Sequence, residues 1–171
     1  MRINKAVATV GAVAALFAGS TLAATTASAQ PDFHARSVAS GLSDAQATSL
    51  QKRVDKVLAG HAGGRQVSPT EVRYDGLNVK VSPTGTFSEA ALNCGYGHLC
   101  MTVNGTNFDF YKCQRWNVHN WTGDGPFINN QTPGTVAKFY NKDGSVRWTS
   151  TAYQSGRATW DPIWSLQPCG A

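Results

Sequence analysis

The four cysteines are the residues best suited to chemistry in this chain of 171 residues: Cys94, Cys100, Cys113 and Cys169. Residues 93–100 read NCGYGHLC, and a pair of thiols around His98 could bind a metal, act as a nucleophile beside its base, or form a disulfide. No paired C-x2-C is present, and His98 lies inside the first cysteine loop, which disfavours zinc. The compartment in which the chain folds decides between the remaining alternatives.

The first 29 residues carry a compartment signal. Arg2 and Lys5 precede an apolar run rich in alanine and glycine, and residues 27–29 read ASA. This pattern predicts a secretory signal peptide over residues 1–29. The alternative is a membrane anchor, but the run is barely long enough to cross a bilayer, and no later segment is as apolar. We therefore expect a secreted protein, without stable membrane insertion after cleavage, whose four cysteines form two disulfides.

The charge of the exported chain argues against a nucleic-acid partner. Removal of the signal peptide leaves 13 basic and 10 acidic side chains, a net charge of +3. These basic residues are scattered, with no run or stripe that would follow a phosphate backbone. We expect no nucleic acid among the partners.

The exported chain has two parts of unlike composition. Residues 30–93 contain no cysteine and no tryptophan, whereas the rest of the chain contains all four cysteines and all five tryptophans. Proline, glycine, serine and threonine cluster between them, in residues 83–91, as in a linker. The sequence predicts an N-terminal extension over residues 30–91 and a disulfide-stapled domain over residues 92–171.

Within the extension, we expect a disordered start over residues 30–40, followed by an amphipathic helix over residues 43–59. Ser43 is a good N-cap, and Gln46 completes a capping box. One face of the helix is apolar and carries Leu50, Val54, Val57 and Leu58. Apolar residues then alternate around Asp75-Gly76, which predicts a β-hairpin over residues 71–81.

The second part reads as short strands and turns. Its strand candidates are rich in β-branched and aromatic residues, and Gly, Asn, Asp and Pro separate them: LCMTV, FDFYKC, FIN, TVAKFYN, SVRWTS and IWSL. Residues 141–144 (NKDG) supply a hairpin turn. Six to eight strands in 78 residues predict a mainly β fold, a small antiparallel sandwich or barrel.

No catalytic set can be assembled from these residues. The four histidines are dispersed, no G-x-S-x-G or H-E-x-x-H motif is present, and Asp109 and Asp161 are the best pair for a glycosidase in a domain too small for a cleft. We expect a protein that is not an enzyme, with no metal and no cofactor. The tryptophans allow two interpretations: they are core side chains, or they are exposed platforms that stack on sugars. Trp121 and Trp160, in loops with glycine or proline, are the candidates for exposure.

The motifs of the second part resemble a known family. CGYGHLC, NFDFYKC followed by Trp, FINNQTPGTVAKFYNKDGSVRWTS, AYQSG and the terminal WSLQPC are similar, over residues 93–170, to secreted actinomycete peptidase inhibitors of the Streptomyces metalloproteinase inhibitor type. The resemblance implies a βγ-crystallin-like Greek-key sandwich with two disulfides, Cys94 with Cys100 and Cys113 with Cys169, one of three possible pairings. Crystallin-like domains often bind calcium, but after Asn129-Asn130 the hydroxyl ligands are missing.

The resemblance also implies the function: a secreted inhibitor, expected to be monomeric, that presents a rigid substrate-like loop to an extracellular peptidase, above all a metalloproteinase. The candidate binding residues are Cys100 and Met101, because an apolar residue beside a staple suits a thermolysin-like pocket, and Trp121. Two alternatives are a non-catalytic binding module for cell-envelope glycan and an antimicrobial, toxin-like crystallin protein.

Overall fold

The structure is a computed structural model that describes residues 31–88 and 92–170. The predicted signal peptide and its cleavage site lie outside the described residues. The described residues from Asp32 onward form one compact unit. In the described part of the chain, no helix is long and apolar enough to span a membrane.

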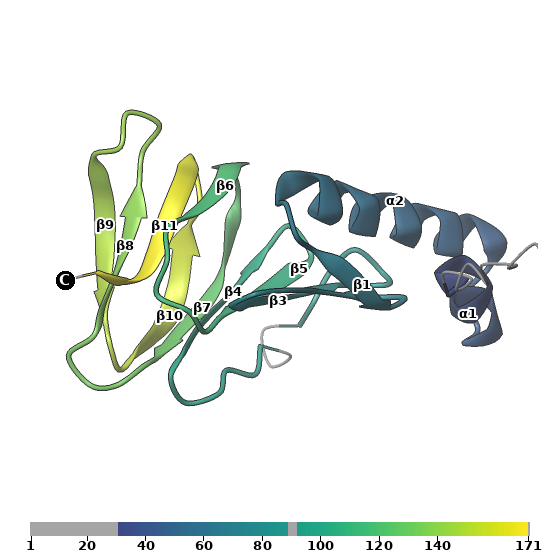
Figure 1. Cartoon of the computed structure of the whole chain (residues 1–171), viewed down its shortest axis with the longest axis horizontal. Helices are drawn as coiled ribbons and strands as arrows, with labels where there is room; N and C mark the ends of the chain where they lie inside the picture. Colours follow the sequence, from purple (N-terminus) through teal and green to yellow (C-terminus); the bar gives the residue numbers. More distant parts are fainter. Residues whose placement is uncertain (1–30, 89–91, 171) are drawn as a thin grey trace, which may run out of the picture. The chain divides into compact units, whose positions relative to one another are not determined.

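Two helices precede a chain of antiparallel strands (Figure 1). The helices are α1 (Phe33–Ala39) and α2 (Asp44–Gly60). The strands are β1 (Arg65–Ser68), β2 (Glu71–Tyr74), β3 (Leu77–Val81), β4 (His98–Val103), β5 (Thr106–Phe110), β6 (Trp116–Trp121), β7 (Asp124–Asn130), β8 (Val136–Tyr140), β9 (Val146–Thr151), β10 (Gln154–Thr159) and β11 (Ile163–Gly170).

Helix α2 agrees with the sequence prediction to within one residue at each end. The Ser43 side chain accepts from the Gln46 amide at 3.2 Å, and the Gln46 side chain accepts from the Ser43 amide at 2.9 Å, which completes the predicted capping box. Leu50 and Val54 of the apolar face are fully buried. The hairpin of β2 and β3 also lies where the alternation predicts it.

The predicted disordered start is instead the short helix α1. Asp32 caps it by accepting from the Ala35 amide at 2.9 Å, and Phe33 is buried. Helix α1 contacts α2. A helix of seven residues has too little local stability to form alone, so its order depends on this packing, which the sequence pattern did not reveal.

The hairpin of β2 and β3 continues into the sheet of the second part. The larger sheet has seven strands in the order β1-β2-β3-β5-β4-β7-β10, and β3 pairs with β5 along its whole length, from Leu77 with Phe110 to Val81 with Thr106. Strand β1 pairs with β2 on one side of this hairpin, and β5 pairs with β3 on the other. The change in composition near residue 91 therefore does not coincide with a boundary between compact units.

The second sheet has four strands in the order β6-β11-β8-β9. Both sheets are antiparallel, which confirms a mainly β fold with two disulfides. One apolar cluster contains residues of both sheets and of α2: Met101 and Phe127 come from the larger sheet, Phe139 and Ile163 from the smaller. The helix, the hairpin and both sheets thus share a single core.

Tryptophan packing brings two backbones close together. The Trp160 side chain is fully buried, and its Nε1 donates to the Thr102 carbonyl at 2.9 Å. At the neighbouring position Gly125, an added Cβ would lie 2.0 Å from that carbonyl oxygen and 2.8 Å from Trp160 Nε1. Only glycine permits this approach of β7 to β4.

Candidate functional site

Two disulfides anchor the loops of the candidate site. Cys94 pairs with Cys100 and Cys113 with Cys169, with Cα–Cα distances of 5.7 and 5.2 Å, as the family resemblance implies. The first closes a short loop that leads into β4. The second ties the connection between β5 and β6 to the end of β11.

The first loop turns sharply and is fastened to β7. The His98 amide donates to the Gly95 carbonyl at 3.2 Å, and Gly97 at the turn has φ +86°. Asn130 donates from Nδ2 to the Cys94 carbonyl at 3.0 Å, and its own carbonyl accepts from the Gly97 amide at 2.8 Å. Tyr96, between the glycines, is 70% exposed. The loop thus presents one large aromatic side chain from a fixed backbone.

A histidine–carboxylate pair holds the end of this loop. His98 Nδ1 lies 2.6 Å from Asp109 Oδ1, and Asp109 on β5 is directly opposite Cys100 on β4. The Cys100 sulfur is 3.5 Å from the same oxygen, but it belongs to a disulfide and has no proton to donate. In hydrolases such a pair activates a nucleophile. The described residues include no free cysteine, and the contact with Asp109 fixes the His98 ring at the end of the first loop.

The second loop, residues 111–115, is exposed yet held along its length. The Tyr111 amide donates to the Gly76 carbonyl at 3.0 Å, and the Tyr111 hydroxyl to the Tyr74 carbonyl at 3.1 Å. Lys112 forms an ion pair with Asp75. These contacts fasten the first half of the loop to the turn between β2 and β3.

The second half of this loop is fastened to the smaller sheet. Arg115 donates from Nε and Nη2 to the Ser165 hydroxyl at 3.0 and 2.9 Å, and its guanidinium lies 3.9 Å from the centre of the Tyr140 ring. Between the two halves, the Gln114 amide donates to the Lys112 carbonyl at 2.9 Å. With Cys113 bonded to β11, every residue of the loop has a fixed contact.

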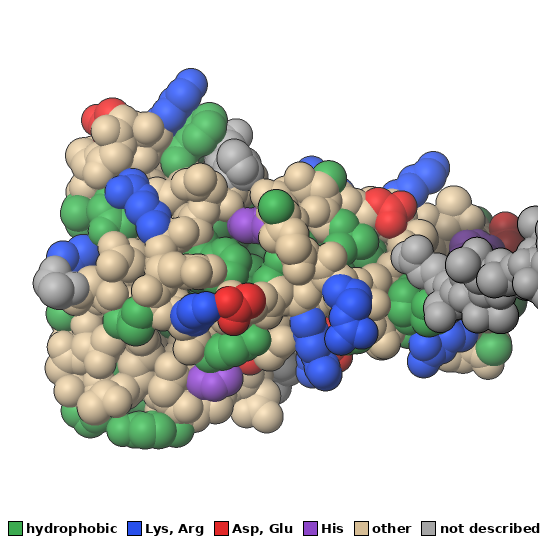
Figure 2. Space-filling model, viewed as in Figure 1, with side chains coloured by type: hydrophobic (Ala, Val, Ile, Leu, Met, Phe, Trp, Pro, Cys, Tyr) green, Lys and Arg blue, Asp and Glu red, His purple; other side chains and the backbone are tan. Residues whose placement is uncertain are grey.

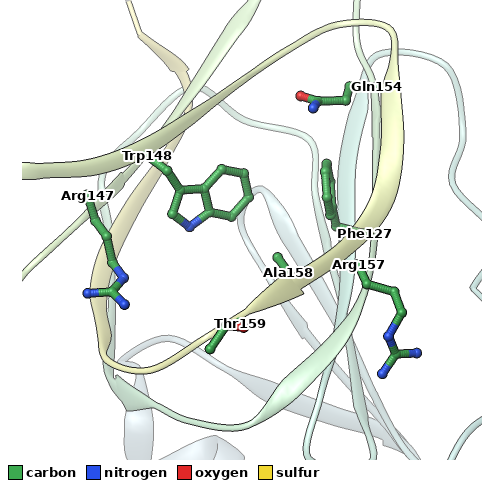
Figure 3. Close-up of a pocket in the computed structure, with 7 residues that line it drawn as sticks. All are labelled: Phe127, Arg147, Trp148, Gln154, Arg157, Ala158 and Thr159. Atoms are coloured by element: carbon green, nitrogen blue, oxygen red, sulfur yellow. The ribbon is translucent and has the colours of Figure 1, made fainter.

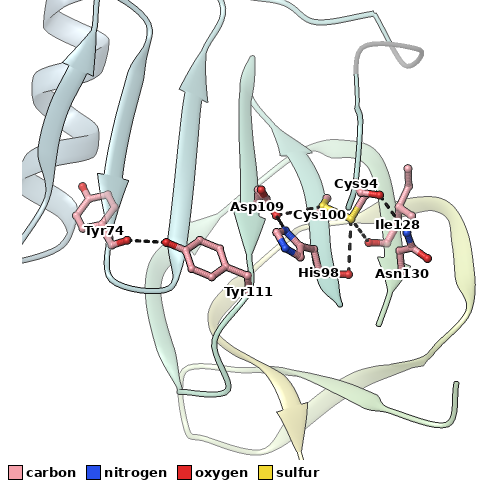
Figure 4. A network of polar contacts seen from close by, with 8 residues as sticks. All are labelled: Tyr74, Cys94, His98, Cys100, Asp109, Tyr111, Ile128 and Asn130. Carbon is pink, nitrogen blue, oxygen red and sulfur yellow. Dashed lines mark hydrogen bonds and ion pairs between the residues drawn. A yellow bond between two sulfur atoms is a disulfide. The ribbon is translucent and has the colours of Figure 1, made fainter. Parts of the chain in front are cut away.

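The two loops are neighbours. The rings of His98 and Tyr111 are tilted by 30° with centroids 5.5 Å apart. Figure 4 shows both rings in one row with the first disulfide and the Tyr74 carbonyl. We call residues 94–98 and 111–115 the paired disulfide loops. Tyr111 is 44% exposed, so each loop contributes one exposed tyrosine.

Tyr74 connects the second loop to helix α2. Its hydroxyl donates to the Val57 carbonyl at 2.8 Å near the end of α2, and its own carbonyl receives the Tyr111 hydroxyl. Burial raises the pKa of the Tyr74 phenol to about 12. The extension thus reaches the exposed loop through Tyr74.

The binding residues expected from the sequence lie elsewhere. Cys100 and Met101 are in β4 with no exposed surface, and Trp121 is only 8% exposed. The bond between Cys100 and Met101 is therefore inside the sheet and is not an exposed substrate-like loop. Tyr96, Tyr111 and Lys112 carry the accessible surface instead. Their positions within or beside disulfide loops were the signal that could have indicated them.

The two tryptophans that were candidates for exposure are core residues. Trp121 ends β6 opposite Ile163, and Trp160 is fully buried with its Nε1 satisfied by Thr102. Trp116 is also buried, while Trp148 and Trp164 are partly exposed. Of the two alternatives, core side chain or exposed sugar platform, this packing supports the core alternative for Trp121 and Trp160.

Asn129 has a structural role at the position considered for calcium. Its Nδ2 donates to the Ser150 carbonyl at 2.8 Å, and its Oδ1 accepts from Gln131 Nε2 at 3.0 Å in a buried setting. Among the described residues, no group of three or more His, Cys, Asp or Glu side chains could hold a metal ion.

On the face of the molecule that Figure 2 shows, the basic side chains are dispersed. Figure 2 shows lysine and arginine side chains spread over the visible face without a single patch. The chain matches no protein-family model, no curated protein and no solved structure.

Proposed function

We propose that the protein is a secreted, non-enzymatic, monomeric peptidase inhibitor that acts through the second of the paired disulfide loops, residues 111–115. The observation that supports this proposal is that an exposed five-residue segment is held at every residue by a backbone bond, a side-chain contact or a disulfide. The resemblance to metalloproteinase inhibitors suggests an extracellular metalloproteinase as the target.

The physical basis of inhibition is pre-organisation. A peptide substrate loses conformational freedom when it binds, whereas this loop has lost it at folding, so a greater share of the contact energy appears as affinity. A peptidase can cleave a flexible segment and release it. Here Tyr111 and Arg115 remain attached to neighbouring strands on either side of the loop.

We further propose a βγ-crystallin-like Greek-key arrangement of β4–β11. The support is the strand order: β5-β4-β7 is completed by β10, and β9-β8-β11 is completed by β6. Each successive group of four strands gives its third strand to the other sheet, so the two halves repeat one pattern. This exchange places the β5–β6 connection, which is the proposed loop, between the two sheets.

The test is residual thermolysin activity against increasing amounts of the oxidised chain, residues 30–171. We expect stoichiometric inhibition, with Tyr111→Ala and Lys112→Ala each weakening it by about tenfold or more, since anchors near the centre of an interface carry most of the binding energy. Tyr153→Ala is the matched control, because Tyr153 is 64% exposed on the connection between β9 and β10.

A second variant separates a lost contact from a lost fold. The double variant Cys113→Ser with Cys169→Ser frees the loop, and circular dichroism reports whether the sheets persist. We expect a folded protein that thermolysin cleaves as a substrate. An oxidised wild-type protein that inhibits neither thermolysin, nor another metalloproteinase, nor subtilisin at micromolar concentration would refute the proposal.

A further inference from the structure

A groove lies between the free edges of the two sheets, where β9 and β10 end their respective strand orders. Its volume is about 570 Å³, and seven described residues line it: Phe127, Arg147, Trp148, Gln154, Arg157, Ala158 and Thr159. Figure 3 shows the Trp148 indole projecting into the centre, with Phe127 across from it. None of these residues belongs to the paired disulfide loops, so the groove is a separate surface.

The Trp148 indole is rigid although it is partly exposed. One face stacks on Phe139 with ring centroids 3.9 Å apart and planes 9° apart, and Phe127 packs beside it at 5.5 Å. Trp160, in the core, lies 6.2 Å away. An aromatic ring that is fixed by the core and open on the groove side offers a flat apolar platform without an ordering cost.

Polar groups around this platform favour a negatively charged ligand. Arg147 and Arg157 are exposed and stand on opposite sides of the indole in Figure 3. None of the seven described lining residues is acidic. Gln154 contributes an amide. The Thr159 hydroxyl donates to Asp124 at 2.6 Å, so it offers the groove only an acceptor.

We infer that this groove binds an acidic saccharide, a sugar chain that carries carboxylates such as uronic acids. The C–H face of a pyranose ring fits an indole platform, and guanidinium groups bind carboxylates through paired charge-assisted hydrogen bonds. The amide of Gln154 and the oxygen of Thr159 complement sugar hydroxyls. Because glycoside hydrolysis needs a pair of carboxyl groups and the described lining has none, the groove binds the saccharide without cleaving it.

The test is to titrate the oxidised chain, residues 30–171, with trigalacturonic acid and, separately, with neutral galactotriose. Calorimetry and tryptophan fluorescence at low salt measure the binding. We expect saturable binding of the acid and binding weaker by about tenfold or more for the neutral sugar, because the neutral sugar cannot form charge-assisted hydrogen bonds with the arginines. Added salt should weaken the binding of the acid.

Substitutions of the lining residues test whether the acid binds in this groove. Arg147→Gln and Arg157→Gln should each weaken trigalacturonate by several fold, and the double variant by about tenfold or more. Arg65→Gln, at an exposed arginine on β1, is the matched control and should leave the affinity unchanged. Trp148→Phe keeps a ring on Phe139 and should remove most of the fluorescence change.

Three outcomes would overturn the inference: no saturable binding of trigalacturonate at millimolar concentration, equal affinity for the neutral sugar, or unchanged affinity in the double arginine variant. Circular dichroism of each variant shows whether the fold persists. The peptidase assay is separate from this one, so failure of either proposal leaves the other standing.

Discussion

Tyr74 contacts helix α2, the apolar core and the second of the paired disulfide loops. The phenol reaches Val57 at the end of α2, the ring packs in the core, and the carbonyl receives Tyr111 from the exposed loop. Alternation in the sequence places Tyr74 on the inner face of a strand, which the structure bears out. Its contact with Tyr111, 37 residues later, has no local signal, because only pairing of β3 with β5 creates it.

Comparing the pH dependence of unfolding free energy in wild type and Tyr74→Phe tests whether the Tyr74 phenol is buried in the folded protein. Because the folded pKa is raised to about 12 from 10.0, the unfolded chain loses this proton first, and the free energy of unfolding falls as pH rises from about 10 to about 12. The slope approaches about 1.4 kcal/mol per pH unit. In Tyr74→Phe this contribution disappears, so the stability gap between wild type and variant should narrow above pH 10. Guanidinium unfolding at a series of pH values measures it; a constant gap would contradict the assignment.

Gly125 allows strand β7 to approach strand β4 closely. Gly125→Ala places a methyl group 2.0 Å from the Thr102 carbonyl oxygen, and the strands must separate to admit it. We expect a loss of about 1–3 kcal/mol of unfolding free energy, measured by urea denaturation. Gly156→Ala on β10 is the control, because its methyl would lie 3.6 Å from the Phe127 ring, an ordinary contact. Equal effects of the two substitutions would refute this explanation.

At the scale of elements, the sequence is informative where burial alternates or a cap is present. Helix α2 and the hairpin of β2 and β3 have both signals. Strand β10 (QSGRAT) has neither, since five of its six residues are exposed on the sheet edge, and β6 (WNVHNW) contains polar residues that suggest a loop. Long-range pairing makes these segments strands: β10 joins β7 over six residue pairs, and β6 joins β11.

Substitution in α2 tests whether the helix belongs to the same cooperative unit as the second part. Leu50→Ala removes a fully buried side chain and should cost about 2–5 kcal/mol. All five tryptophans lie after residue 93, so tryptophan fluorescence reports only the second part. We expect the fluorescence transition in urea to shift together with the helical signal in circular dichroism. A fluorescence midpoint unchanged from wild type would show that α2 unfolds independently. Lys52→Ala, exposed on the same helix, is the control.

At the scale of the whole molecule, the two parts of the chain differ in composition but share one apolar core. Residues 30–93 lack cysteine and tryptophan, and α2, β2 and β3 contribute mostly aliphatic side chains to the shared core, whereas the second part contributes tryptophan and the disulfides. A compositional boundary is evidence of a domain boundary only when each side can bury its own core. The extension consists of two helices and strands β1–β3, and buried side chains of α2, β2 and β3 belong to the same apolar cluster as those of the second part.

The two disulfides should contribute unequally to global stability. They close loops of 6 and 56 residues, and in the chain-entropy model these contribute roughly 2 and roughly 4 kcal/mol. Removing Cys113–Cys169 by paired serine substitution should therefore lower the melting temperature more than removing Cys94–Cys100. Differential scanning calorimetry compares the two double variants. A larger loss from the shorter loop would indicate that the contacts of Asn130 and His98 with that loop dominate over chain entropy.

The position of Cys113 in the middle of its loop has a consequence for any peptidase that nicks it. Hydrolysis between Cys113 and Gln114 leaves two polypeptides joined through Cys169, so the intact mass rises by one water and the fragments separate only after reduction. Hydrolysis between Lys112 and Cys113 places both bonded cysteines in the same fragment, and denaturation alone releases the other. Mass spectrometry without reductant therefore distinguishes attack on one side of Cys113 from attack on the other.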